Sequence, residues 1–174
     1  MRAETRISEI GRPAPRFLER FALEMRESDA LEVLGTTGTP RGGLAAHLGR
    51  EIADAASAGG RTWAVTERGR ALALFGVVPD SAAASSARIW MLAAGEAQAR
   101  PVSFARWSRR CLRRALQEFP EIEVFHNFAP AAAGPGREWL AWLGAWFPAR
   151  GACVSPWTGE RFSMFAIQRE DVNV

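Results

Sequence analysis

Few side chains in this sequence could serve as an acid, a base or a nucleophile. Glu96 and His126 are the two candidates for acid/base catalysis, because carboxylates and imidazoles commonly transfer protons in enzymes. Each also has an ordinary interpretation. Glu96 would be a loop carboxylate, and His126 would be a sheet histidine, since it alternates with Val124 and Phe128. On these residues alone we assign no catalytic group.

The cysteines and histidines are too sparse for a metal site. Cys111 and Cys153 have no CxxC partner, and His47 and His126 lie 79 positions apart. We therefore expect no metal, and we expect both cysteines to be small buried hydrophobic residues rather than a disulfide or a reactive thiol. All 22 basic residues are arginine, which excludes Schiff-base or other lysine nucleophile chemistry.

Arginines gather on one side of a helix predicted over residues 103–119. The opposite side carries the apolar residues, so the helix is amphipathic. A solvated face is one interpretation of the arginines, and contact with an acidic partner chain or with phosphates is the other. A protein partner is favoured over nucleic acid, because no exposed aromatic residues and no nucleic-acid motif accompany them. The arginines are Arg106, Arg109, Arg110, Arg113 and Arg114.

These residues must be positioned by a strand, helix, strand, helix unit. Residues 89–94 and 121–128 are short apolar runs that predict buried strands, with the arginine helix between them and a helix over 137–147 after them. Two strands joined by a crossover helix are parallel neighbours. The three tryptophans of the last helix, at 139, 142 and 146, share a face with Leu143 and are expected in the core.

The rest of the chain completes one α+β (α/β) domain with a mixed central sheet flanked by helices. Helical periodicity over 16–26 and 44–58 precedes a hairpin over 62–78, a short helical turn is expected to stop at Gly35, and a second hairpin over 153–167 closes the domain. We divide the chain into an arm at 1–15, the domain at 16–167 and a tail at 168–174, and residues 7–12 of the arm are either a first short strand or irregular. No secretory signal and no apolar run of about 20 residues is seen, so we expect a chain made in a cytoplasm and no membrane partner.

This order of elements resembles the GCN5-related N-acetyltransferase (GNAT) fold. Asn127 and the helix containing Trp139 to Gly144 are similar to the family's late segment, in which an Asn-containing strand end leads to an aromatic-rich helix. The chain departs from that pattern at residues 145–147. A narrower resemblance is to the GNAT-like proteins of short-tailed bacteriophages, carried by Phe75-Gly76-Val77 before Trp90-Met91-Leu92 and by the segment from Phe104 to Arg109.

The resemblance implies a site for coenzyme A, and the sequence lacks two of its parts. The family holds the pyrophosphate with backbone N–H groups of a glycine-rich turn that opens the helix after the central strand. In this sequence Pro101 occupies the position of the first glycine of that turn, and proline has no N–H to donate. Only Gly95, Gln98 and Ser103 remain as contacts if coenzyme A binds, with Ser103 also a possible cap of the helix. The family commonly uses a tyrosine as the general acid that protonates the departing thiolate. Leu140 occupies that position here, and the chain contains no tyrosine.

We therefore expect a catalytically silent GNAT-like domain that acts as a structural or assembly component of a tailed-phage virion. Its partners would be other virion proteins, and it would need no cofactor. The alternative is a coenzyme A-dependent N-acyltransferase with a degenerate pyrophosphate loop, for which acetyl-CoA would be the donor. A basic nucleic-acid-binding module is the third hypothesis.

Overall fold

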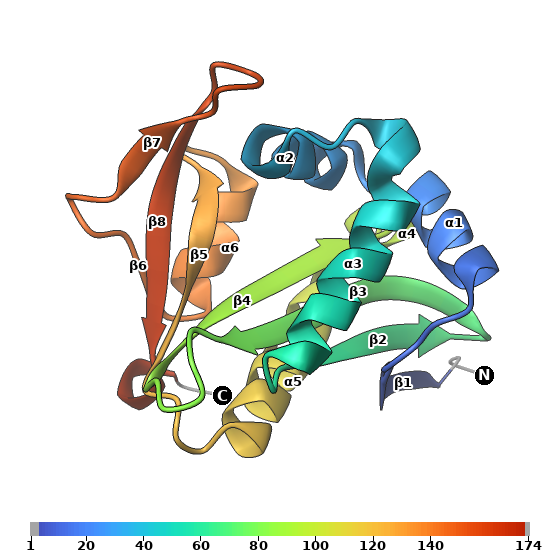
Figure 1. The fold of residues 1–174 in the computed structure, drawn as a ribbon, viewed down its shortest axis with the longest axis horizontal. Helices are drawn as coiled ribbons and strands as arrows, with labels where there is room; N and C mark the ends of the chain where they lie inside the picture. Colours follow the sequence, from blue (N-terminus) through green and yellow to red (C-terminus); the bar gives the residue numbers. More distant parts are fainter. Residues whose placement is uncertain (1–3, 173–174) are drawn as a thin grey trace.

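The computed structural model describes residues 4–172, which form one mixed sheet covered by helices on both faces (Figure 1). The strands are β1 (Thr5–Glu9), β2 (Arg61–Glu67), β3 (Arg70–Pro79), β4 (Ser86–Ala93), β5 (Val124–Pro130), β6 (Ala145–Trp146), β7 (Ala152–Val154) and β8 (Arg161–Gln168). Their order is β1-β2-β3-β4-β5-β8-β6, with β7 also paired to β8. Among the strands of residues 4–172, only β4 and β5 pair in parallel. The expected α+β class with a mixed central sheet is confirmed.

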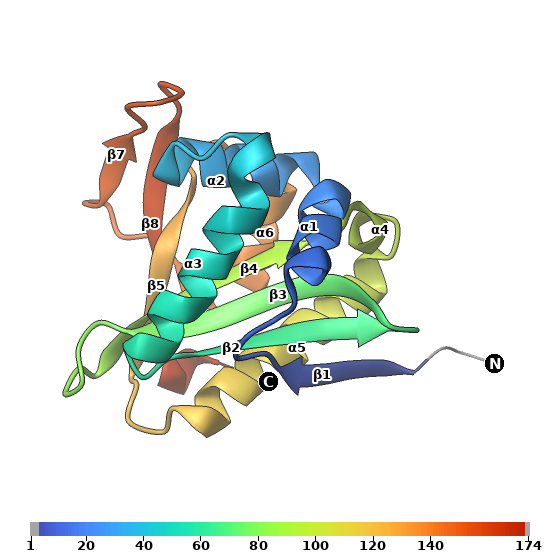
Figure 2. The same ribbon diagram turned by 45° about the vertical axis from the view of Figure 1, so that its right-hand side comes forward.

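The helices form two layers. On one face lie α1 (Pro15–Glu24), α2 (Glu27–Thr37) and α3 (Leu44–Ser57), and on the other lie α5 (Pro101–Glu118) and α6 (Pro135–Trp142), as Figures 1 and 2 show. The one-turn helix α4 (Gly95–Gln98) follows β4, and two 3-10 turns span Arg41–Gly43 and Arg169–Asp171. None of the helices in residues 4–172 is both long and apolar enough to cross a membrane.

Strand β3 separates two apolar cores. Leu74 packs in the cluster under α1 and α3, and its neighbour Phe75 packs in the cluster under α5. Successive side chains of a strand point to opposite faces, so a strand covered on both faces reads as a continuous apolar run. This explains why the run from Ala71 to Val77 shows no alternation of polar and apolar residues.

Two parts of the chain differ from the expected local structure. Part of the expected arm, Thr5–Glu9, is the edge strand β1 and pairs antiparallel with β2. Helix α2 does not stop at Gly35 but runs to Thr37, where Gly38 at φ 73° ends it. Position 35 is a glycine because of close packing and not because the helix ends there. A Cβ atom at this position would lie 2.6 Å from the ring of Phe162.

The placement of two tryptophans and one cysteine in the core was wrong. Trp142 and Trp146 are 46% and 45% exposed, and Trp139 alone of the three is packed against the core. Helix α6 is only eight residues long, so its buried side ends with Leu140, and Trp142 turns outward to α5. Cys111 is buried as expected, but Cys153 is exposed because β7 is a three-residue strand that pairs only with β8.

Trp142 instead lies under the guanidinium of Arg109, 4.1 Å from the ring centroid. We expect Trp142→Ala to lower the free energy of unfolding by about 1 kcal/mol, the contribution of an exposed cation–π pair. Chemical denaturation measures this, with Trp63→Ala as the control. Trp63 is fully buried and stacks on Phe75 at 4.8 Å, so its loss should cost about 3–5 kcal/mol. Equal losses in the two variants would contradict the surface position of Trp142.

Candidate functional site

The sheet opens between its two parallel strands. The β4–β5 ladder covers only Ser86–Arg88 against Val124–His126, and the strands diverge beyond it. At that point the Asn127 side chain replaces the missing ladder bond. Its Nδ2 donates to the carbonyl of Ile89 at 2.8 Å, and its Oδ1 accepts from the N–H of Phe128 at 2.8 Å. Asn127 therefore holds the opening at a fixed width.

Past the hydrogen bond between Asn127 and Ile89, the backbone N–H and C=O of Met91 on β4 have no partner strand within the part of the chain that the structure describes. Ala94 N–H donates to Leu72 of β3, so by alternation the N–H groups of Ala93 and Met91 point away from β3 into the opening. Ala93 N–H donates to Asp29 Oδ2 at 2.6 Å. Among the residues from 4 to 172, no strand pairs with the opening side of Met91. Its N–H and C=O are thus available to an extended ligand.

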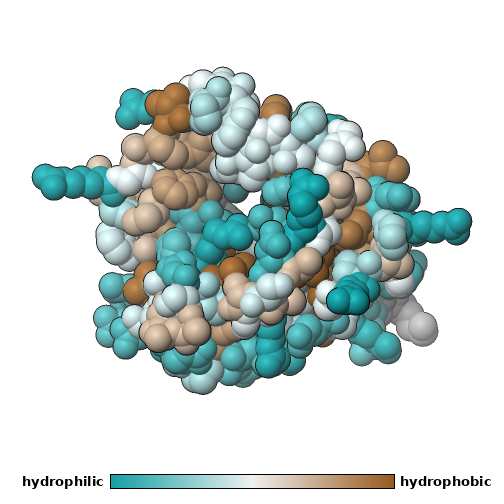
Figure 3. Space-filling model, in the orientation of Figure 1, coloured by the Kyte–Doolittle hydropathy of each residue, from teal (hydrophilic) through white to brown (hydrophobic). Residues whose placement is uncertain are grey.

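Two cavities meet at this opening. The larger, about 770 Å³, lies on the side of α5 and α6, and the smaller, about 380 Å³, lies on the side of α2 and α3. Figure 3 shows the hollow in the surface near the middle of the molecule. Four residues line both cavities, namely Glu32, Trp90, Leu92 and Asn127.

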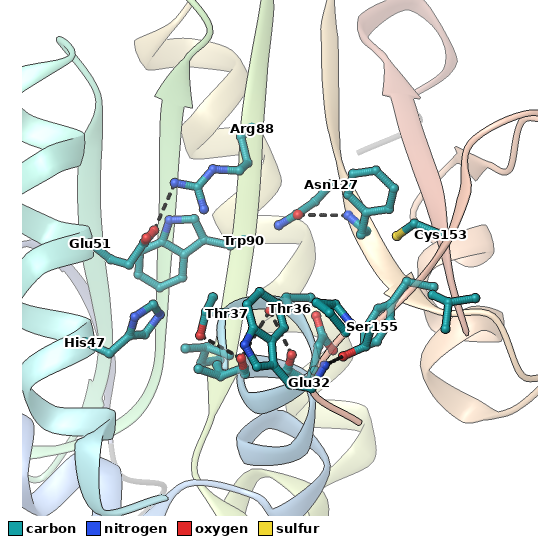
Figure 4. A pocket seen from close by; sticks show the side chains of 18 of the residues that line it. Glu32, Thr36, Thr37, His47, Glu51, Arg88, Trp90, Asn127, Cys153 and Ser155 are labelled. Atoms are coloured by element: carbon teal, nitrogen blue, oxygen red, sulfur yellow. Dashed lines mark hydrogen bonds and ion pairs between the residues drawn. The ribbon is translucent and has the colours of Figure 1, made fainter. Parts of the chain in front are cut away.

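Glu32 is the titratable residue at the junction (Figure 4). Burial raises its pKa to about 8, and the negative charge of Asp29, one helical turn earlier, adds to the shift. A carboxylate with such a pKa exchanges protons near neutral pH, which suits a general base. Glu32 was not among the residues that the sequence suggested. Asp29 of the same helix is buried as well, and the sequence carries no local signal for the role of either acid.

Asp29 fastens α2 to the end of β4. The carboxylate is almost fully buried, pairs with Arg26 at 2.8 Å and accepts the Ala93 N–H. Burial raises its pKa, and Arg26 and these hydrogen bonds oppose that shift. Arg26 in turn lies over the ring of Phe104 on α5, with its guanidinium carbon 5.0 Å from the centroid. These contacts place Glu32 at the opening.

The start of α5 closes the far end of the larger cavity. Pro101 is its first residue and lines the cavity together with Gln98. The Arg100 guanidinium beside it is held by Glu67 and Glu96, each at 2.7 Å. The first hydrogen bond at the start of the helix runs from the Phe104 N–H to the Arg100 carbonyl. The N–H groups of Val102 and Ser103 therefore have no partner within the helix.

The other residues suggested by the sequence lie outside both cavities. Glu96 pairs with Arg100 and, at 3.3 Å, with Arg70. His126 Nε2 is 2.9 Å from Asp80 Oδ2 where the β4–β5 ladder begins. Gly95 opens α4, and Ser103 is the third residue of α5. The expected cap by Ser103 is not made, because Pro101 starts the helix two residues earlier.

The arginine face of α5 turns away from both cavities. Arg106, Arg110 and Arg113 are exposed, Arg114 pairs with Glu118 at 2.8 Å, and Arg109 stacks on Trp142. The argument for a protein partner assumed that no exposed aromatic residue accompanied these arginines. Trp142 is such a residue, so that premise was wrong. The identity of any partner of this face stays a prediction.

No protein-family model matches the sequence, and no curated protein matches it either. Solved structures match nearly the whole chain. A chimeric spermidine N-acetyltransferase of Vibrio cholerae has a TM-score of 0.66 at 15% identity, covering 97% of this chain and 97% of its own. A Desulfovibrio desulfuricans protein assigned to the GNAT family has a TM-score of 0.66 at 12% identity, covering 95% and 99%. AAC(6')-Ib in complex with ribostamycin and coenzyme A has a TM-score of 0.67 at 10% identity, covering 97% and 95%. The chain has the GNAT fold.

These neighbours overturn the expectation of a catalytically silent virion component. Acetyltransferases recur among them, and nothing in the comparisons connects the chain to the virion proteins of tailed phages. The expectation gave too much weight to the missing glycines and tyrosine and to a short similarity around residues 75–92.

Proposed function

We propose that the chain is an N-acyltransferase that moves an acyl group from a coenzyme A thioester to an amine. One observation carries the proposal: Glu32, with its raised pKa, lies where two separate cavities meet at the opening of the sheet. An acyl transfer needs this arrangement, because two substrates must meet at one proton acceptor.

The larger cavity fits the pantetheine arm of coenzyme A, and we call it the donor cavity; the smaller one, which would receive the amine, we call the acceptor cavity. Its walls include Ile89, Met91, Leu112 and Phe165, which suit a chain of methylene groups. The arm also carries two amide groups, and the free N–H and C=O of Met91 would pair with them as an added strand would. These residues fit the arm.

Few hydrogen-bond donors are available for the diphosphate of coenzyme A. A helix start attracts phosphates through its free N–H groups and its partial positive charge. Pro101 removes one of those donors, and Glu67 and Glu96 already hold the Arg100 guanidinium. The N–H groups of Val102 and Ser103 remain. We therefore expect a donor that binds through its arm more than through its phosphates.

In the chemical step, the amine nitrogen attacks the thioester carbonyl, a C–N bond forms, and the C–S bond breaks. Glu32 accepts the proton that the amine loses. No tyrosine is present to protonate the departing thiolate. Water supplies that proton in this proposal.

The degenerate helix start provides a gain-of-binding test. Pro101→Ala restores a backbone N–H at the donor cavity and should tighten acetyl-CoA binding about tenfold, the effect of one hydrogen bond to a charged group. Isothermal titration measures it, with wild-type dissociation constants expected above about 10 μM.

Pro15→Ala is the matched control, because Pro15 is also the first residue of a helix but lines neither cavity. It should leave acetyl-CoA binding unchanged. If neither the wild type nor Pro101→Ala takes up acetyl-CoA, the donor is not a coenzyme A thioester.

A further inference from the structure

The charges of the acceptor cavity select among amines. We propose that the acceptor is a monoamine with a flat apolar body, and that Arg88 excludes acceptors with a second positive charge. This inference rests on the proposed function and names the substrate class of the same site.

Four aromatic side chains are among the residues that line the acceptor cavity. The indole of Trp90 lies flat on β3, because a Cβ atom at Gly76 would be 2.5 Å from its ring. Phe128, Phe162 and Trp157 line the other sides. Trp157 packs as closely over Gly38, at the end of α2. A cavity walled by flat rings favours a flat apolar body over a hydroxylated or highly charged one.

The carboxylates of the cavity are not equivalent. Glu51 Oε2 is 2.9 Å from Arg88 Nη2, so its charge is already neutralised. His47 has its pKa lowered, chiefly by burial, and is therefore neutral near pH 7. Among the described residues that line this cavity, Glu32 is the carboxylate without an arginine in an ion pair. The cavity thus offers one site for an ammonium or amine nitrogen.

The two charged ends are separated by the tryptophan floor. Figure 4 shows Arg88 and Glu51 on one side of Trp90 and Glu32 on the other. An amine placed at Glu32 would extend its body along Trp90 toward Arg88. An apolar ring is tolerated there, whereas a second ammonium would find Glu51 already paired with Arg88 and would lose its hydration without gaining a counter-charge. A desolvated charge without a partner is a usual way to reject the wrong substrate.

Competing acceptors test the proposal with acetyl-CoA as the donor. The wild type should acetylate phenethylamine with a kcat/KM at least about tenfold above that for putrescine, a diamine. Arg88→Gln frees Glu51 to hold the second ammonium. That variant should raise the ratio of kcat/KM for putrescine to kcat/KM for phenethylamine about tenfold over the wild-type ratio.

Arg12→Gln is the matched control, because Arg12 is exposed and lines neither cavity. It should keep the wild-type ratio. A wild type that prefers putrescine, or an Arg88→Gln ratio equal to that of the wild type, overturns the proposal.

Direct binding separates this inference from the proposed function. Phenethylamine and putrescine are titrated into the protein calorimetrically without a donor. If no amide forms but phenethylamine binds, and putrescine binds only to Arg88→Gln, the selectivity stands and the acyl transfer fails. If neither amine binds to either protein, the inference is overturned.

Discussion

Replacing Glu32 by glutamine is expected to lower kcat by about 10²–10³-fold, the usual loss when a general base is removed. The substitution keeps the shape of the side chain but cannot accept the amine proton. Binding of the acyl donor should change little, because the donor is held by the arm-binding walls of the donor cavity and the edge of β4. Steady-state kinetics with phenethylamine and acetyl-CoA measure both quantities. Glu27→Gln, an exposed change on the same helix, is the control and should keep the wild-type rate.

The pH dependence gives the same variant a second readout. With the pKa of Glu32 raised to about 8 by burial, kcat/KM of the wild type should rise with pH through that value as the carboxylate ionises. Glu32→Gln should lose this step. A rise through the same pH that persists in Glu32→Gln would mean that another group is the base.

The folded state also loses stability as Glu32 ionises. Its pKa rises from an ordinary 4.5 when unfolded to about 8 when folded, so between these values the folded chain holds a proton that the unfolded chain has released. The contribution of protonated Glu32 to the free energy of unfolding is fully present below pH 4.5 and is lost as the pH rises toward 8. At pH 9 Glu32→Gln should be more stable than the wild type by about 2 kcal/mol, less than the full shift would give because the side chain keeps some solvent contact. A less stable variant at pH 9 would show that the ionised Glu32 has a stabilising partner.

Asn127→Ala is expected to lower the free energy of unfolding by about 2–4 kcal/mol, because it removes two hydrogen bonds and leaves two backbone groups unpaired. Those groups are the carbonyl of Ile89 and the N–H of Phe128, each 2.8 Å from the Asn127 amide. The opening between β4 and β5 would lose its fixed width. Acyl transfer should therefore fall together with stability.

Urea denaturation and turnover at a temperature where both proteins are folded measure these two effects. Ser57→Ala is the control. Its hydroxyl donates to Ala53 at 2.9 Å on an exposed turn of α3, so the change should cost less than about 0.5 kcal/mol. An equally small loss for Asn127→Ala would show that other contacts hold the strands apart.

The central strand, helix, strand, helix unit could be predicted because its signals are local. Apolar runs of strand length at 89–94 and 121–128 and the amphipathic run of α5 each report on their own backbone. Trp142 shows where this fails. A helical wheel assigns it to the apolar side, but α6 ends at that residue, and the neighbouring Arg109 provides a surface contact for its ring.

The candidate base could not be found from local pattern. Glu32 lies on α2, and its importance comes from two strands that follow more than 50 residues later in the chain. Its pKa depends on how deeply α2 packs over the opening, which Asp29 fixes through the end of β4. Sequence spacing carries no information on that packing. The sequence does show that a proline, Pro101, replaces the first glycine of the pyrophosphate turn. That replacement bears on the affinity for a diphosphate and not on the presence of a reaction site.

Amine-dependent consumption of acetyl-CoA tests the central claim most directly. The purified protein is incubated with acetyl-CoA and phenethylamine, and the acetylated amine and free thiol are followed together by mass spectrometry and thiol titration. We predict that the two products appear in equal amounts, that both require the amine, and that Glu32→Gln slows the formation of both by about 10²–10³-fold. Acetyl-CoA that is consumed no faster with protein and amine than without them, across the donors and amines tried, would contradict the account.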